Sequence, residues 1–184
     1  MITTTDSQEE VRQAVERLLG AMCERPGDVR VELAPSERRP VLTVSVNQVD
    51  YGAVLGKHRS MLEALQLLAA LAGARRGLSG VEVILDKRHS APANGAVRRR
   101  QAAAEPWDQA PFEAAVGRAL ESIFDEFQFD VRRVSSEASR LTITLQEDPP
   151  FREEDRPRVE RALEAVFNCV GAMQGRRILV ELVA

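Results

Sequence analysis

One ten-residue stretch, from residue 50 to residue 59, carries the residue types that could bind an anion. Its sequence, DYGAVLGKHR, joins two glycines to Lys57, His58 and Arg59. Glycine lets the backbone approach a ligand closely. A helix that begins just after such a stretch, at Ser60, offers free N–H groups and a partial positive charge. The pattern is typical of a phosphate site, and it is also typical of a plain turn between a strand and a helix.

Apolar periodicity predicts the elements that position this stretch. Residues 7–22 have an apolar helical face, and the run after Ser60 has another. Apolar and polar residues alternate over 29–33, 41–46 and 81–85, as in half-buried strands. The predicted order is therefore helix, strand, strand, helix and strand, with the glycine-bearing stretch between the second strand and the second helix.

Several phrases in this order match one family. Residues 25–31 read RPGDVRV, the loop reads DYGAVLGKHR, residues 62–68 read LEALQLL and residues 81–86 read VEVILD. With these phrases in register over about residues 8–87, the chain resembles the KH domain of the small bacterial KhpA-type RNA-binding proteins. The family's GxxG loop would end in a second glycine, where this chain has Arg59. A residue with a Cβ disfavours positive φ, so the change restricts the loop backbone.

The resemblance implies a site for single-stranded RNA of about four nucleotides. Backbone N–H groups near the second loop glycine and the Lys57 ammonium would contact phosphates, and Arg59 would add a charge-assisted contact that partly replaces the lost glycine. Val54 and Leu55 would lie under the bases, or belong only to the core. The implied RNA-binding residues are Gly52, Val54, Leu55, Gly56, Lys57, His58 and Arg59.

Other chemistry is poorly supported. The chain has two histidines and two cysteines, and none of them has metal-ligand spacing, so we expect no metal and no cofactor. His58 is a better polar loop contact than a catalytic base, and no nucleophile motif accompanies Ser60. Tyr51, beside the loop, either stacks on a base or covers the edge of the sheet. An enzyme is therefore the weakest interpretation.

The second half repeats the same order of elements. Residues 89–106 lack apolar periodicity and predict a flexible linker, whose run Arg98 to Arg100 contacts phosphate or is simply solvated. Beyond it, apolar patterns predict a helix over 112–127, strands near 131–134 and 141–145, a helix over 159–170 and a strand over 178–182. Short sequence matches at offsets of about 100 residues indicate a degenerate second copy.

The second copy lacks the glycine loop and is acidic. Its corresponding segment, residues 147–155, contains no glycine and five carboxylates. Residues 1–88 have no net charge, whereas residues 107–184 hold 10 basic and 15 acidic residues, a net charge of −5. Carboxylates repel phosphate, so the second half predicts a poor RNA surface and a better surface for protein contact.

The whole chain has 184 residues and a net charge of −3, which excludes a protein that coats nucleic acid by bulk charge. We predict an α+β protein of two KH-like α-β-β-α-β units, each a three-stranded sheet packed on helices: residues 7–88 with the loop, a linker over 89–106, and residues 107–184 without the loop. The predicted function is binding of single-stranded RNA in the bacterial cytoplasm, with no signal peptide and no membrane contact. The alternative is a protein-interaction or homodimerisation module that has lost RNA binding.

Overall fold

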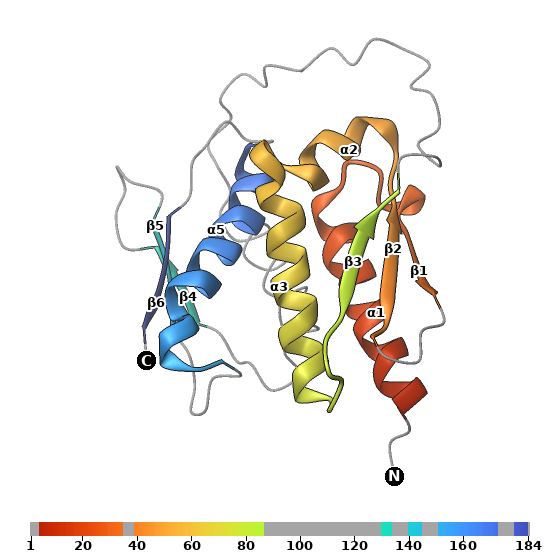
Figure 1. Cartoon of the computed structure of the whole chain (residues 1–184). Coiled ribbons are helices and arrows are strands. Elements are labelled where there is room, and N and C mark those ends of the chain that lie inside the picture. The colour runs from red at the N-terminus through yellow and green to blue at the C-terminus, as the bar shows by residue number, and fades with distance from the viewer. Residues whose placement is uncertain are drawn as a thin grey trace.

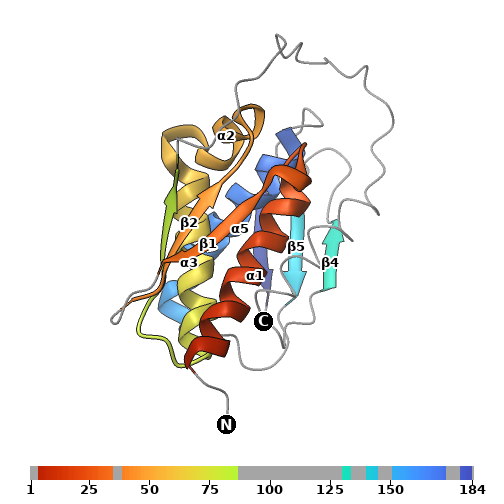
Figure 2. The same cartoon turned by 90° about the vertical axis from the view of Figure 1, so that its right-hand side faces the viewer.

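Two three-stranded sheets flank a layer of helices in the structure (Figure 1). The structure, a computed structural model, describes residues 4–34, 39–86, 130–133, 140–144, 151–172 and 179–183. The view turned by 90° shows the same order of layers, with α1 and α3 against the first sheet and α5 against the second (Figure 2).

The first sheet is formed by the N-terminal half of the chain. Its strands lie in the order β1-β2-β3, with β1 antiparallel to β2 and β2 parallel to β3. The crossover between the two parallel strands contains α2 and α3, as a parallel pair requires. The elements are α1 (Thr4–Met22), β1 (Arg30–Ala34), β2 (Val41–Ser45), α2 (Gln48–Leu55), α3 (Ser60–Arg75) and β3 (Glu82–Leu85).

These bounds agree with the predicted helices and strands of the first half, apart from one added helix. Residues 48–55, which the sequence placed in the junction between strand and helix, form α2. Asn47 starts this helix, because its side chain accepts a hydrogen bond from the Val49 N–H at 3.1 Å. Gly56 ends it with a φ of 72°. The actual loop is therefore shorter than predicted, and the observed order is α-β-β-α-α-β.

The second sheet has the same topology. Its order is β4-β5-β6, with an antiparallel first pair and a parallel second pair, and α5 lies between the two parallel strands in the chain. The elements are β4 (Asp130–Arg133), β5 (Arg140–Thr144), α5 (Arg156–Ala172) and β6 (Leu179–Val183). The predicted helix over 112–127 and the predicted linker over 89–106 lie outside the described residues.

One continuous core joins the two sheets. α3 is apolar around much of its circumference and packs on β3 on one side and on α5 on the other. The buried side chains of α5, among them the fully buried Phe167, belong to the same cluster as those of α1 and α3. The second sheet is thus attached to the first through helix packing, because the apolar faces of α3 and α5 are buried against each other.

The two cysteines lie in this shared interior. Cys23 is buried and Cys169 is half-buried, and both are free thiols. Burial raises the pKa of Cys23 to about 12, and the nearby Asp50 carboxylate adds to the shift. Burial and Asp50 also raise the pKa of Cys169 to about 11. The Cys169 thiol donates to the Ala53 carbonyl at 3.6 Å, which connects α5 to α2. Both thiols therefore stay protonated and unreactive at neutral pH.

No helix in the described ranges combines the length and the apolar character that a bilayer crossing requires.

Asp50, near the start of α2, forms hydrogen bonds with the backbone just after the end of α1. Only 3 % of this residue is exposed, and its carboxylate accepts hydrogen bonds from the backbone N–H groups of Glu24 at 2.8 Å and Arg25 at 3.2 Å. We expect Asp50→Ala to lower the free energy of unfolding by about 2–4 kcal/mol, because it leaves both donors without a partner. Asp50→Asn, which keeps one carbonyl acceptor, should cost less. Urea denaturation measures both, and equal stability of the two variants and the wild type would contradict this role.

Candidate nucleic-acid interface

The loop between α2 and α3 is a four-residue turn with an unusual backbone. Three of its residues have positive φ: Gly56 at 72°, His58 at 54° and Arg59 at 66°. The Arg59 N–H donates to the Gly56 carbonyl at 3.2 Å, which closes the turn. The path of the chain therefore reverses within four residues, and α3 begins at once with Ser60.

Gly56 is required at its position for two reasons. Its φ of 72° disfavours any side chain, and a Cβ there would lie 2.6 Å from the Met61 backbone nitrogen and 2.7 Å from the Met61 Cβ. Such a Cβ cannot be accommodated without moving the first turn of α3. Gly52 is different, since it lies exposed in α2 and a Cβ there would meet nothing within 4 Å.

Arg59 occupies the position of the missing second glycine and still adopts the left-handed conformation. The structure thus keeps the turn despite the substitution, at a cost of about 1–2 kcal/mol for a residue with a Cβ. His58 is less strained at its φ of 54°, because His is one of the residues that more often enter this region. Residue 59 therefore keeps the left-handed conformation of the turn, and its Cβ makes that conformation strained.

The loop presents a concentrated positive charge to solvent. Lys57, His58 and Arg59 are all exposed. None of the ion pairs and side-chain hydrogen bonds formed by the described residues uses these three side chains. The N-terminus of α3, which begins at Ser60, adds a partial positive charge next to the loop, although the Ser60 N–H itself donates to the Lys57 carbonyl. An anionic ligand would meet these groups without first breaking an ion pair.

The other predicted site residues have varied positions. Gly52 is exposed on α2, whereas Val54 is 1 % exposed and belongs to the core. Leu55 is half-buried beside the loop. Tyr51 is half-buried and packs against the core. The structure therefore brings the residues from Leu55 to Arg59 together at the surface and puts Val54 beneath them.

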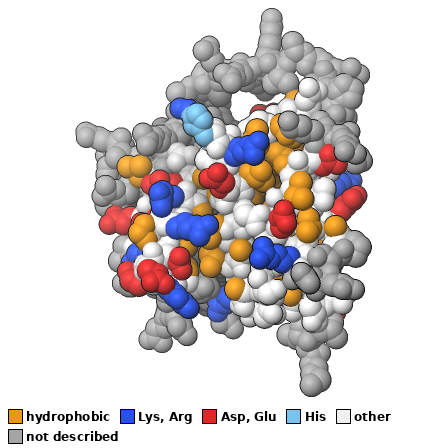
Figure 3. Space-filling model, in the orientation of Figure 1, with side chains coloured by type: hydrophobic (Ala, Val, Ile, Leu, Met, Phe, Trp, Pro, Cys, Tyr) orange, Lys and Arg blue, Asp and Glu red, His pale blue; other side chains and the backbone are white. Residues whose placement is uncertain are grey.

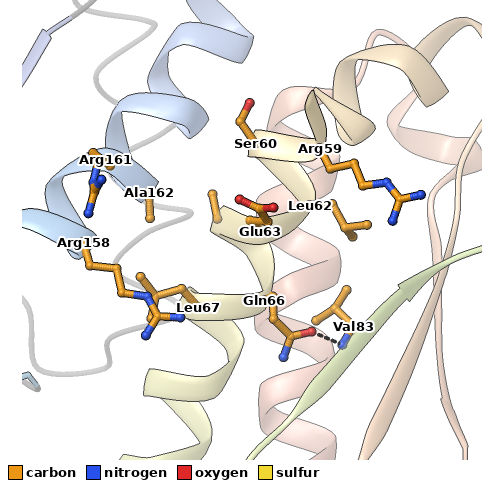
Figure 4. A pocket seen from close by; sticks show the side chains of 11 residues that line it. Arg59, Ser60, Leu62, Glu63, Gln66, Leu67, Val83, Arg158, Arg161 and Ala162 are labelled. Carbon is orange, nitrogen blue, oxygen red and sulfur yellow. Dashed lines mark hydrogen bonds between the residues drawn. The ribbon is translucent and has the colours of Figure 1, made fainter. Parts of the chain in front are cut away.

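An open groove of about 650 Å³ runs over the outward face of α3, next to the loop. α5 borders one side and β3 the other (Figure 4). Arg59 lies on the β3 side, and Arg158 and Arg161 lie on the α5 side. The remaining lining side chains are Ser60, Leu62, Glu63, Ala64, Gln66, Leu67, Val83 and Ala162. With three arginines against one glutamate, the lining has a net positive charge.

Gln66 fixes the β3 side of this groove. β3 is an edge strand, and the N–H of Glu82, which donates to the Pro40 carbonyl, points toward β2. Val83 therefore directs its N–H to the free edge, where it donates to the Gln66 side-chain oxygen at 2.7 Å. The Gln66 amide also donates to the Val81 carbonyl. One side chain thus satisfies a donor and an acceptor of the exposed edge.

At the equivalent edge of the second sheet, two glutamates of α5 bond to the backbone of β6. Glu164 accepts from the Val180 N–H at 3.2 Å, and Glu160, one helical turn earlier, accepts from the Leu182 N–H at 3.1 Å. In α3, the position equivalent to Glu160 is Leu62. The apolar side chain of Leu62 cannot accept a hydrogen bond from the edge of β3 at Leu85. Within the described residues, α3 therefore leaves part of the β3 edge without a side-chain partner, whereas carboxylates of α5 cover the edge of β6.

Sequence reasoning missed Gln66, Arg158 and Arg161. Gln66 lies within the LEALQLL phrase, but no pattern indicates that its side chain reaches a strand edge. The two arginines were counted within an acidic half, and only the packing of α5 on α3 brings them beside Arg59. In the described residues there is no cluster of three or more metal-ligating side chains.

Comparison with known proteins points to a single family. The model of the KhpA/KhpB KH domain matches residues 12–85. The "RNA-binding protein KhpA" of Treponema pallidum (strain Nichols) is 38 % identical over 65 residues, which cover 35 % of this chain and 81 % of the relative. The proteins of the same name from Mycobacterium bovis and Mycobacterium tuberculosis are also 38 % identical, with the same coverage. The residues matched by the family model include the loop.

The close approach of Gly56 to Met61 gives a direct test of the loop. We expect Gly56→Ala to lower the free energy of unfolding by about 2–4 kcal/mol, from positive-φ strain and a forced shift of α3. Gly52→Ala is the matched control, and it should leave stability unchanged or raise it by about 0.5–1 kcal/mol, as expected for a helix interior. Thermal and urea unfolding measure both. Similar effects of the two substitutions would show that the turn does not have this geometry.

Proposed function

The chain belongs to the KhpA/KhpB KH-domain family, and we propose that it binds single-stranded RNA through the Gly56–Arg59 loop of its first KH unit. The observation that carries this proposal is the loop itself. Three positive-φ residues hold Lys57, His58 and Arg59 at the surface, with no ion pair to any described residue. The similar proteins of the same family are named as RNA-binding.

The physical basis is contact with phosphate. The Lys57 ammonium and the Arg59 guanidinium make charge-assisted hydrogen bonds with phosphate oxygens, which are stronger than neutral ones. The N–H groups of Gly56, Arg59 and Ser60 are already bonded to carbonyls, so further donors for these oxygens come from the first turn of α3 beyond Ser60. Bases that pack on the half-buried Leu55 remove apolar surface from water. Bases that reach the edge of β3 meet backbone donors and acceptors there. Val54 contributes to the site only by its packing in the core beneath the loop.

The second KH-like unit, residues 107–184, is the other part of the proposal. Its support is the topology shared by the two sheets, including the position of α5 in the parallel crossover. In the described part of this unit, α5 follows a short turn, Glu153–Asp155, that has three carboxylates and no positive-φ residue. A unit of this kind does not offer a phosphate loop of its own.

A second candidate function is a protein-interaction or homodimerisation module. The observation that favours it is Arg59, which strains the turn where the family pattern has glycine. The open face of the first sheet, with Ile84 45 % exposed, offers an apolar contact for a partner. Absence of RNA binding by the wild-type protein, together with a dimer in solution, would favour this function over the first.

Lys57→Asp combined with His58→Asp tests the loop. We expect at least about a tenfold weaker affinity for short single-stranded RNA of mixed sequence, because one carboxylate replaces the Lys57 ammonium and a second is added beside it, and both repel phosphates at the loop. Asp tolerates the left-handed conformation of residue 58, so the turn is kept. Fluorescence polarisation measures the affinity, and far-UV circular dichroism and melting should be unchanged.

The control for this variant is Arg17→Asp, which reverses a charge on the exposed side of α1, away from the loop. We expect nearly wild-type affinity from it. Wild-type affinity in the loop double variant would remove the loop from the binding site.

A further inference from the structure

The groove over α3 has a wall that comes from the second unit. Arg158 and Arg161 are three residues apart on α5, so they lie on one face of that helix, about 4.5 Å apart along its axis. Both are exposed and line the groove on the side opposite β3 (Figure 4). The space-filling view shows Lys and Arg side chains, together with a histidine, on this face of the molecule, with Asp and Glu side chains among them (Figure 3).

No acidic residue of α5 or of its preceding turn lines the groove. Glu160 and Glu164 accept hydrogen bonds from the edge of β6, so they face away from the groove. Two glutamates of the turn form ion pairs with their own neighbours: Glu153 with Arg156 at 2.7 Å, and Glu154 with Arg152 at 3.3 Å. The net charge of −5 over residues 107–184 is therefore not the charge of the groove lining, to which this unit contributes Arg158, Arg161 and Ala162.

We propose that α5 forms the second wall of a composite RNA site. An RNA strand held at the Gly56–Arg59 loop continues over α3, with Arg158 and Arg161 on its phosphates and with Leu62 and Leu67 beneath its bases. The volume of about 650 Å³ gives room for about one or two nucleotides beyond those at the loop. This inference rests on the proposed function, since it lengthens the same binding site.

Charge and continuity favour RNA as the occupant over an acidic peptide. Arg59 belongs to both the loop and the groove, so a ligand bound at the loop enters the groove without leaving the positive surface. The floor is apolar apart from Ser60, Glu63 and Gln66, and Gln66 already pairs with β3. An extended chain of phosphates with flat bases fits cationic walls with an apolar floor between them.

The same arrangement gives the second unit a role. Its own strand edge is covered by Glu160 and Glu164, and its turn before α5 is acidic, so it offers little to RNA by itself. Packed on α3 through a shared core, it instead holds two arginines beside the first unit's loop. The acidic second half then contributes to RNA binding through the position of one helix.

The decisive variant is Arg158→Gln with Arg161→Gln in the full chain. We expect unchanged affinity for a four-nucleotide RNA, which the loop alone holds, and about tenfold weaker affinity for an eight-nucleotide RNA. The slope of log K against log salt concentration for the longer RNA should fall in magnitude by about 1.4, from about 0.7 for each of two lost phosphate contacts. The matched control, Arg17→Gln with Arg25→Gln, removes two exposed arginines outside the groove and should change neither quantity.

A gain of affinity gives independent evidence, since misfolding cannot produce it. Glu63 is the one carboxylate among the groove residues, and Glu63→Gln should bind the eight-nucleotide RNA several-fold more tightly, with no change for the shorter RNA. Wild-type affinities for the longer RNA in both groove variants would overturn the composite site.

The outcomes separate this inference from the proposed function. Normal binding in the groove variants, with loss of binding in the loop variant, would overturn the composite site and keep the loop. Absence of any RNA binding by the wild-type chain would overturn both. Binding of hexaglutamate that is lost in the arginine double variant, while RNA binding is kept, would assign the groove to an acidic protein segment and overturn the RNA inference.

Discussion

The candidate site depends on how closely the backbone of Gly56 approaches the start of α3. A Cβ on Gly56 would lie 2.6 Å from the Met61 nitrogen, so only glycine allows α2 to end and α3 to begin within one tight turn. Met61 is buried, and its position sets the direction of α3 against β3 and α5. The exposed cations, the floor of the groove and the contact with the second unit all follow from that direction. The strain at Arg59 persists because the packed helices on both sides of the turn hold it in place.

The two sheets share a topology and differ in what their crossover helices place at the strand edge. An edge strand has backbone donors and acceptors that need partners. At the edge of β3, the neutral Gln66 of α3 satisfies one donor and one acceptor, and Leu62, one helical turn closer to the loop, is apolar. On β6, Glu160 and Glu164 satisfy two donors and bring negative charge. The same fold therefore leaves one edge open to an anionic ligand and makes the other edge repel it, through the choice of two or three side chains.

The sequence was sufficient for the strands and long helices of the first half and for the position of the loop, because these depend on local periodicity and on glycine. It was not sufficient for α2, which is short, contains Gly52 and is started by the side chain of Asn47, a signal too local to stand out. The groove could not be predicted at all. Its walls come from residues about 100 positions apart, and the amphipathic pattern of α5 states only that one face is buried, without naming the helix that covers it.

The net charge of a chain segment does not determine whether one of its surfaces attracts an anion. A phosphate responds to the groups within about 10 Å, the screening length at moderate salt, and not to the net charge of a domain. In the described part of the second half, Glu160 and Glu164 accept hydrogen bonds from backbone N–H groups and Glu153 pairs with Arg156, while Arg158 and Arg161 remain exposed beside α3. The residues of this unit that line the groove are therefore positive, although the unit as a whole is acidic. For helices that pack across a core, the charge of one face is the quantity that bears on binding, and only the packing identifies that face.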